Sequence, residues 1–216
     1  MTHSTDEAFG PPTPGSDQYL RLKDLDGYGK EGVELRVMEI PAVFGWERWT
    51  AATKERPSGA PVRWRDGQPV PHHNWRTAPG GKAESAKMFR ALWVWNVKRE
   101  KLQVLVFTQG QIVDGFRNLY ENSRWGDPTG YSVALSRSGS GLETVYSLLP
   151  LEKGPLPSEA VKQFARIKNE CAGLAALFDG GDPFAPFGSA AGTADHNDPD
   201  SWRESAAGAV DDDIPF

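Results

Sequence analysis

Tryptophans alternate with basic residues in one stretch of the chain. The sequence contains eight tryptophans in 216 residues, a high number, and four of them lie at Trp46, Trp49, Trp64 and Trp75. The basic residues between and beside them are Arg48, Lys54, Arg56, Arg63, Arg65 and Arg76. Indole rings stack on exposed nucleobases, and lysine and arginine bind phosphates, without requiring a particular base sequence. The pattern predicts a surface for single-stranded nucleic acid, although tryptophans are also common in protein cores.

Charge is distributed unevenly along the chain. Residues 48–101 hold twelve Lys/Arg against four Asp/Glu, whereas residues 172–216 hold nine acidic residues and one basic residue, Arg203. The net charge of −5 therefore hides a strongly basic segment of the kind that binds a polyanion. Within this segment, the further basic residues that we expect to contact DNA are Lys87, Arg90, Lys98, Arg99 and Lys101.

Two more tryptophans, Trp93 and Trp95, lie on a predicted strand over residues 88–97 and share a face with Phe89 and Val97. If that face packs in the core, both are core residues. If it lines a binding groove, both can stack on bases. The sequence leaves these alternatives open.

The last six residues form a motif of three aspartates followed by a short apolar end. They are Asp211, Asp212, Asp213, Ile214, Pro215 and Phe216. Folding does not require such an ending, because chain termini are usually frayed. A partner protein could take the phenyl ring in a pocket and the carboxylate on a basic residue. The alternative is an acidic tail that only aids solubility.

Residues for catalysis or metal binding are few. The histidines are His3, His72, His73 and His196, and no nucleophile-elbow, zinc-protease or P-loop motif occurs. The single cysteine, Cys171, excludes an internal disulfide and any zinc site with several cysteines. We therefore expect no catalytic residues, no metal and no cofactor.

The chain has no run of 18 apolar residues, and residues 1–15 lack the basic start and apolar core of a signal peptide. We therefore expect a cytoplasmic protein without a membrane partner.

Apolar periodicity predicts one mainly β domain. Strands are expected at 33–40, 88–97, 102–107, 131–137 and 142–149, with a possible short strand at 62–65. Segment 41–88 otherwise shows little periodicity. A helix is expected after Thr108, with Thr108 and Gln111 as a capping box. A second helix is expected to be capped by Ser158, and its apolar stripe runs through Val161, Phe164, Ile167, Cys171, Leu174 and Phe178.

These elements predict a five- to six-stranded antiparallel barrel of the OB-fold type with two helices, and a small α+β sandwich is the alternative. The expected organisation is a disordered N-terminus over 1–16, a domain over 17–178, a flexible acidic linker over 179–210 and a partner-docking tip over 211–216.

Several short motifs occur in an order that resembles phage helix-destabilising proteins of the T-even type. They are Leu92 to Asn96, Leu102 to Phe107, Thr108-Gln109, Trp125 to Pro128, Tyr131, Arg137 to Gly139 and Thr144 to Tyr146. The resemblance covers roughly residues 19–155 and implies an OB-fold that coats single-stranded DNA in phage replication, recombination and repair. T-even members carry a structural zinc, but this chain lacks the cysteines, so no zinc is expected.

The terminal hexapeptide resembles the tip of bacterial single-stranded DNA-binding proteins, which implies docking of replication and repair enzymes, including those of a host.

The sequence thus predicts a non-catalytic single-stranded DNA-binding protein whose tail recruits enzymes. The alternatives are a nuclease or annealing protein that acts on DNA, and an adaptor whose tryptophans are all in the core. The oligomeric state, the footprint on DNA and the preference for DNA over RNA are not determined by the sequence.

Overall fold

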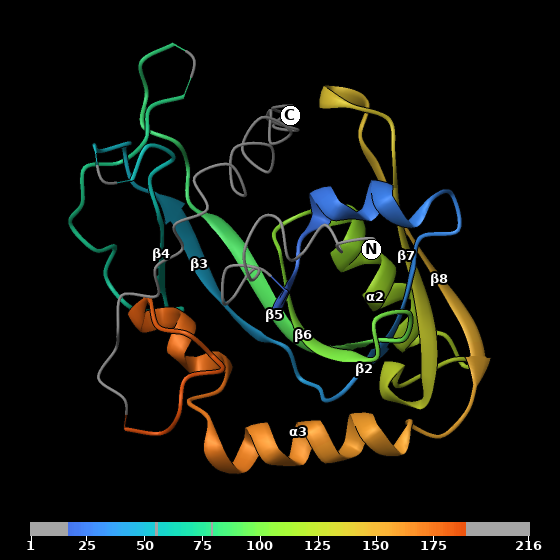
Figure 1. The fold of residues 1–216 in the computed structure, drawn as a ribbon. Helices are drawn as coiled ribbons and strands as arrows, with labels where there is room; N and C mark the ends of the chain where they lie inside the picture. The colour runs from blue at the N-terminus through green and yellow to red at the C-terminus, as the bar shows by residue number, and fades with distance from the viewer. Residues whose placement is uncertain (1–16, 55, 79, 189–216) are drawn as a thin grey trace, which may run out of the picture.

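The structure is a computed structural model and describes residues 17–54, 56–78 and 80–188. Its eight strands form one mixed sheet in the order β1-β6-β5-β2-β7-β8, with β3 paired to both β5 and β4 (Figure 1). The strands are β1 Tyr19–Leu20, β2 Val33–Val37, β3 Val43–Trp49, β4 Pro61–Trp64, β5 Lys87–Asn96, β6 Lys101–Phe107, β7 Tyr131–Ser138 and β8 Val145–Lys153. The helices are α2 Gly110–Glu121 and α3 Ser158–Glu170, with 3-10 turns η1 Leu22–Tyr28, η2 Pro128–Gly130, η3 Gly141–Glu143 and η4 Leu174–Asp179.

Strand β5 is the centre of the sheet. One edge pairs with β6 from Arg90 to Asn96, while the other edge is divided between β3, at residues 87–91, and β2, at residues 94–96. This division lets the β3–β4 hairpin extend away from the β2–β7–β8 part of the sheet, and the whole sheet is curved (Figure 1).

Alternation along β5 and β6 separates two hydrophobic cores. Leu92, Leu105 and Phe107 point to one face, where they pack with η1, α2, β2 and β7. Phe89, Trp93, Trp95 and Val104 point to the other face, which α3 and η4 cover. Figure 1 shows α3 running beneath the sheet on this second face. Helix α2 therefore lies against one face of the sheet and α3 against the other.

Both predicted α-helices are present, but neither begins as expected. The α2 N-cap is Gln109 without a side-chain cap, and Gln111 instead accepts a hydrogen bond from the Tyr146 amide at 2.6 Å. The predicted capping box is therefore wrong. The α3 N-cap is Pro157, so Ser158 lies inside the helix and does not cap it.

The predicted apolar stripe of the last helix is interrupted. The helix ends at Glu170, so Leu174 and Phe178 belong to η4, while Val161 points outward and is half exposed. Ala160 and Ile167 are its buried residues.

The predicted barrel of antiparallel strands is not confirmed. Strand β1 runs parallel to β6, and the sheet is mixed and not closed. The mainly β content and the two α-helices agree with the prediction.

The folded part extends beyond residue 178, where a flexible linker was predicted to begin. Amide groups of Ala172 and Gly173 donate to the carbonyls of Ala185 and Pro183, and the Phe184 ring lies 4.9 Å from the Trp93 ring. Residues 179–188 therefore complete the α3 side of the core. The rest of the predicted linker, the tip and residues 1–16 lie outside the described residues.

Strand β2 carries a buried arginine, Arg36, whose burial the sequence did not indicate. The Arg36 guanidinium donates to the carbonyls of Thr129, Gly154 and Pro155 at 2.8 to 3.1 Å. Burial lowers the pKa of Arg36. These hydrogen bonds tie β2 to the loops at the start of β7 and the end of β8.

No helix in the described part of the chain is both long and apolar enough to cross a membrane.

Candidate nucleic-acid interface

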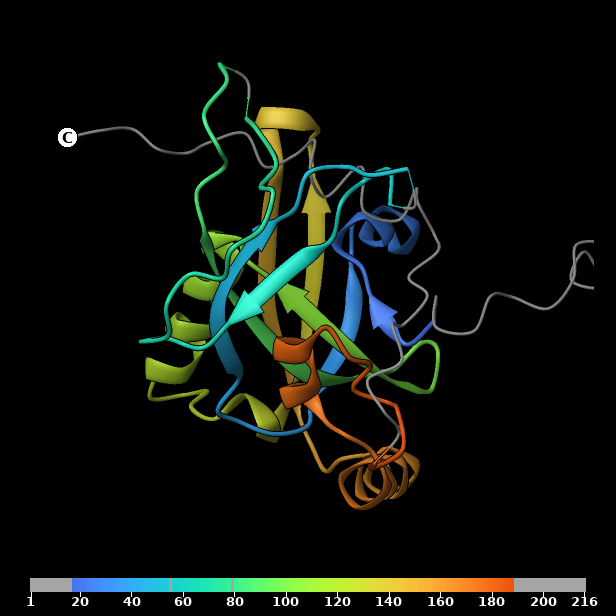
Figure 2. The same cartoon turned by 90° about the vertical axis from the view of Figure 1, so that its left-hand side faces the viewer.

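Segment 41–88 contains the β3–β4 hairpin, whose strands carry five of the predicted DNA-binding residues: Trp46, Arg48, Trp49, Arg63 and Trp64. In β3, Val43, Gly45, Glu47 and Trp49 point to the α3 side, because Gly45 pairs with Phe89 of that core. The alternate residues point to the α2 side. Figure 2 shows the hairpin with α2 on one side and η4 with α3 on the other.

Gly45 explains why the hairpin can pack so closely on η4. A Cβ atom at this position would lie 2.7 Å from a ring carbon of Phe178 and 2.5 Å from the Trp64 carbonyl oxygen. Only glycine leaves room for the Phe178 ring, so this residue fixes which face of β3 is covered by protein.

The uncovered α2 side carries aromatic rings and guanidinium groups together. We call it the aromatic–arginine face; its residues are Phe44, Trp46, Arg48, Trp64, Trp75 and Arg90. The register aligns Trp64 with Trp46 across β4 and β3, and Phe44 with Arg90 across β3 and β5. Trp75 joins this face through its bridge to Thr50 at the end of β3.

Contacts between rings and guanidinium groups fix the side-chain positions on this face. The Arg48 guanidinium lies 4.7 Å from the centre of the Trp75 ring, and Trp75 lies 6.3 Å from the buried Trp64. The Trp46 indole N–H donates to Asp66 at 2.9 Å. Phe44 is 54% exposed although it is a large apolar residue in a strand. Trp64 is thus a support, while Phe44, Trp46 and Trp75 present accessible ring surface.

Other predicted residues of the hairpin point to the opposite face. Arg63 pairs with Glu47 at 2.6 Å, and the two side chains are only 8% and 10% exposed. Lys87 aligns with Glu47 on this same face, and Arg65 lies over the Phe178 ring at 4.2 Å. The structure therefore does not bring these three residues together with Trp46.

Arg76 and Trp49 form a separate contact at the end of β3. The Arg76 guanidinium lies 5.4 Å from the centre of the Trp49 ring and pairs with Glu84 at 2.7 Å. Glu84 balances the charge of Arg76, so this pair contributes less to an anion-binding surface than Arg48 does.

Trp93 and Trp95 are core residues, which settles the two alternatives that the sequence left open. Each is 2% exposed, because α3, η4 and Phe184 cover their side of β5. Neither ring can stack on a base, so their assignment to a DNA-binding site is wrong.

Lys98, Arg99 and Lys101 lie at the far end of β5. Trp46 pairs with Met88, and eight residue steps, about 26 Å at 3.3 Å per residue, separate Met88 from Asn96, so these residues are remote from Trp46. Arg99 and Lys101 pair with Asp17. Partial burial pushes the pKa of Asp17 upward, but Lys101 and Arg99 bring it below its ordinary value. This cluster ties the chain near β1 to the β5–β6 turn.

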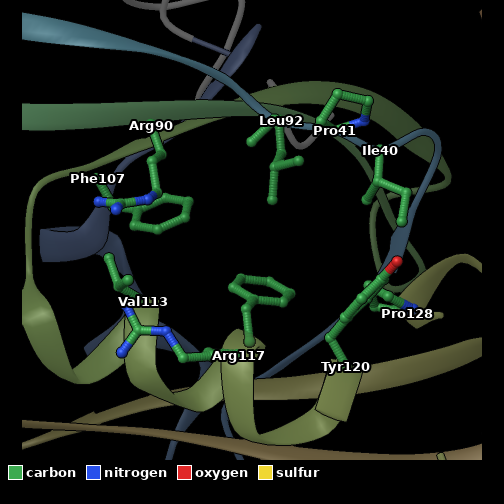
Figure 3. Close-up of a pocket in the computed structure, with 11 residues that line it drawn as sticks. Ile40, Pro41, Arg90, Leu92, Phe107, Val113, Arg117, Tyr120 and Pro128 are labelled. Atoms are coloured by element: carbon green, nitrogen blue, oxygen red, sulfur yellow. The ribbon is translucent and has the colours of Figure 1, made fainter. Parts of the chain in front are cut away.

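The structure also reveals a group of site residues of which the sequence indicated only Arg90. A pocket of about 580 Å³ lies between α2 and the α2 side of the sheet, next to Phe44. Arg90, Leu92 and Phe107 line it from the sheet, and Val113, Arg117 and Tyr120 line it from α2 (Figure 3). The loop after β2, which includes Ile40 and Pro41, closes one end.

Within the described residues, no group of three or more His, Cys, Asp or Glu side chains is arranged to hold a metal ion. His72 and His73 are exposed, and the His73 ring contacts Trp75 at 5.3 Å. Comparisons with protein-family models, with curated proteins and with solved structures found no match for the chain.

Proposed function

We propose that the chain is a non-catalytic single-stranded DNA-binding protein that binds DNA along the aromatic–arginine face. In this proposal it coats DNA during replication, recombination and repair. The observation that carries the proposal is an exposed Phe44 on the same strand face as Trp46 and Arg48. Burying such a ring against a base removes apolar surface from water, and it does not require a specific sequence.

The spacing of the rings suits a single strand. Phe44 and Trp46 are two residues apart on one face of β3, which separates their α-carbons by about 6.8 Å. Stacked bases lie about 3.4 Å apart, so one base can insert between two rings at this spacing. The bases of a duplex are already paired and stacked, and for this reason the face favours single strands.

The arginines of the face provide the phosphate contacts. Arg48 and Arg90 lie on either side of the ring pair, and neither pairs with a carboxylate of the described residues. Two phosphate contacts on a single strand give a slope of log affinity against log salt of about −1.4. Affinity should therefore fall about sevenfold when salt rises from 50 to 200 mM.

A titration tests this proposal. The full chain is mixed with oligo-dT at two salt concentrations, and intrinsic tryptophan fluorescence and the anisotropy of labelled DNA are followed together. We expect salt-sensitive quenching with a matching anisotropy rise. Absence of both signals at low salt would reject DNA binding and favour an adaptor protein.

A nuclease or annealing protein would behave differently in two simple assays. A nuclease would shorten end-labelled DNA in the presence of magnesium, and an annealing protein would pair complementary strands faster than passive coating does. We expect intact DNA and no such acceleration.

We also propose that residues 211–216 dock partner enzymes of replication and repair. This segment lies outside the described residues, so the support is its sequence alone. A synthetic peptide of this hexapeptide should compete with the full chain for a captured enzyme, whereas a peptide without Phe216 should not.

A further inference from the structure

Helix α2 buries one row of residues in the first core, and a second row lines the pocket, although its Val113 and Phe116 also pack against that core. Ile112 and Leu119 are its buried residues and join the first core. A second stripe, Val113, Phe116, Arg117 and Tyr120, follows the spacing of three and four residues and lines the pocket. Tyr120 is 58% exposed at the end of this stripe. An exposed aromatic ring beside an apolar pocket indicates a surface that binds a ligand or a partner.

The pocket has an apolar interior and a positive rim. Leu92, Phe107 and Phe116 supply apolar surface, and the Phe107 and Phe116 rings stack at 5.9 Å. Arg90 and Arg117 are its charged residues, one from the sheet and one from α2 (Figure 3). No lining residue of the described chain is acidic. The lining therefore suits a flat, largely apolar group that is attached to negatively charged groups.

The pocket is continuous with the aromatic–arginine face. Arg90 aligns with Phe44 on one side and with Phe107 on the other, so a single residue belongs to both surfaces. A strand lying over Phe44 and Trp46 would reach the pocket at Arg90. Continuity and charge both identify the occupant as part of the same polyanion.

We propose that this pocket holds one nucleobase, turned out of the line of bases, while Arg90 and Arg117 bind the phosphates on either side of it. A volume of about 580 Å³ lies within the usual range for small-molecule sites and accommodates one nucleotide. Turning out a base from a single strand is easier than from a duplex, because no base pair is broken. This inference rests on the proposed function and adds a discrete nucleotide position to it.

Photochemical cross-linking tests the position directly. The full chain is bound to oligo-dT that carries 5-iodouracil and irradiated, and cross-linked residues are mapped by mass spectrometry. We expect adducts on Tyr120 or Phe116 in addition to Phe44 or Trp46. Adducts confined to the aromatic–arginine face would overturn the pocket and leave the proposed function standing. Absence of any adduct, together with absence of binding, would overturn both.

Two variants test the pocket by affinity. Val113→Phe fills it without changing charge, and its matched control is Val161→Phe at a half-exposed position of α3. Loss of one stacked base should weaken oligo-dT binding about 5- to 150-fold and remove the α2 adducts. An unchanged affinity of Val113→Phe would overturn the inference.

Arg117→Gln removes a rim charge at an exposed site, so the fold is not at risk. Arg117 pairs with Asp114 within its helix, and the control Arg166 pairs with Glu170 in the same way on α3. Arg117→Gln should lower the magnitude of the salt slope by about 0.7, and Arg166→Gln should leave it unchanged. Equal slopes for the two variants would overturn the role of Arg117.

Discussion

Replacing Phe44 by alanine separates a binding role of this residue from a structural one. Full truncation of a buried phenylalanine destabilises a protein by about 3–5 kcal/mol. Phe44 is 54% exposed, so about half of that burial is absent and the loss of unfolding free energy should stay near 2 kcal/mol or below. The variant should therefore remain folded.

The same substitution should also weaken the binding of DNA. One stacked base contributes about 1–3 kcal/mol, which corresponds to a decrease in affinity of about 5- to 150-fold. Binding is measured by anisotropy of labelled oligo-dT, and the free energy of unfolding by urea titration of the free protein. The two measurements distinguish lost contact from lost structure.

Phe187 provides the matched control for Phe44. It is also a phenylalanine and 60% exposed, but its amide donates to Glu170 at the end of α3, on the other side of the sheet. Phe187→Ala should leave affinity within twofold of the parent chain. Equal losses in the two variants, or full affinity in Phe44→Ala, would refute the assignment of the face.

Three further changes have defined outcomes. Arg90→Gln should reduce the salt slope of oligo-dT binding by about 0.7, whereas Lys98→Gln at the far end of β5 should not change it. Glu47→Ala leaves the Arg63 charge buried and should lower the free energy of unfolding by about 3 kcal/mol in urea titration, and the double variant with Arg63→Met should recover much of it. If Arg63 contacts DNA, the double variant will also bind oligo-dT with a smaller salt dependence. Deleting residues 211–216 should leave DNA affinity equal or slightly higher and abolish capture of a partner enzyme, whereas a large loss of affinity would place this segment in the DNA site.

Local pattern was sufficient to predict several of the strands. The strand that begins at Val33 and the hairpin of β5 and β6 are confirmed, although β5 and β6 carry buried apolar residues on both of their faces. Helix α2 was likewise predictable from Ile112, Phe116 and Leu119. These signals depend on residues close together in the sequence.

Strand β3 was missed because large residues point to both of its sides. Val43 and Trp49 alternate with Phe44 and Trp46, so no contrast of period two exists. Gly45 made the segment look like a loop. A glycine is needed there because the Phe178 ring, which is distant in the sequence, lies against it. No strand was therefore predicted at Trp46 and Trp49, although both lie in β3.

Which tryptophans are accessible and which pack in the core could not be predicted either. The alternation of side chains along the strand correctly placed Trp93 and Trp95 on one face with Phe89. Phe184, which covers this face, comes about 90 positions later in the chain. The open, mixed arrangement of the sheet and the pocket beside α2 likewise depend on contacts between distant segments. Sequence pattern therefore predicted most of the secondary-structure elements, whereas tertiary packing determines which of their residues remain on the surface.

The indole N–H signals of the nitrogen-15-labelled chain, recorded with and without oligo-dT, test the central claim most directly. Single Trp→Phe variants assign each signal. We predict that the signals of Trp46 and Trp75 shift on saturation, while those of the buried Trp93 and Trp95 stay in place. An unchanged spectrum, or shifts confined to Trp125 outside the aromatic–arginine face, would contradict the account.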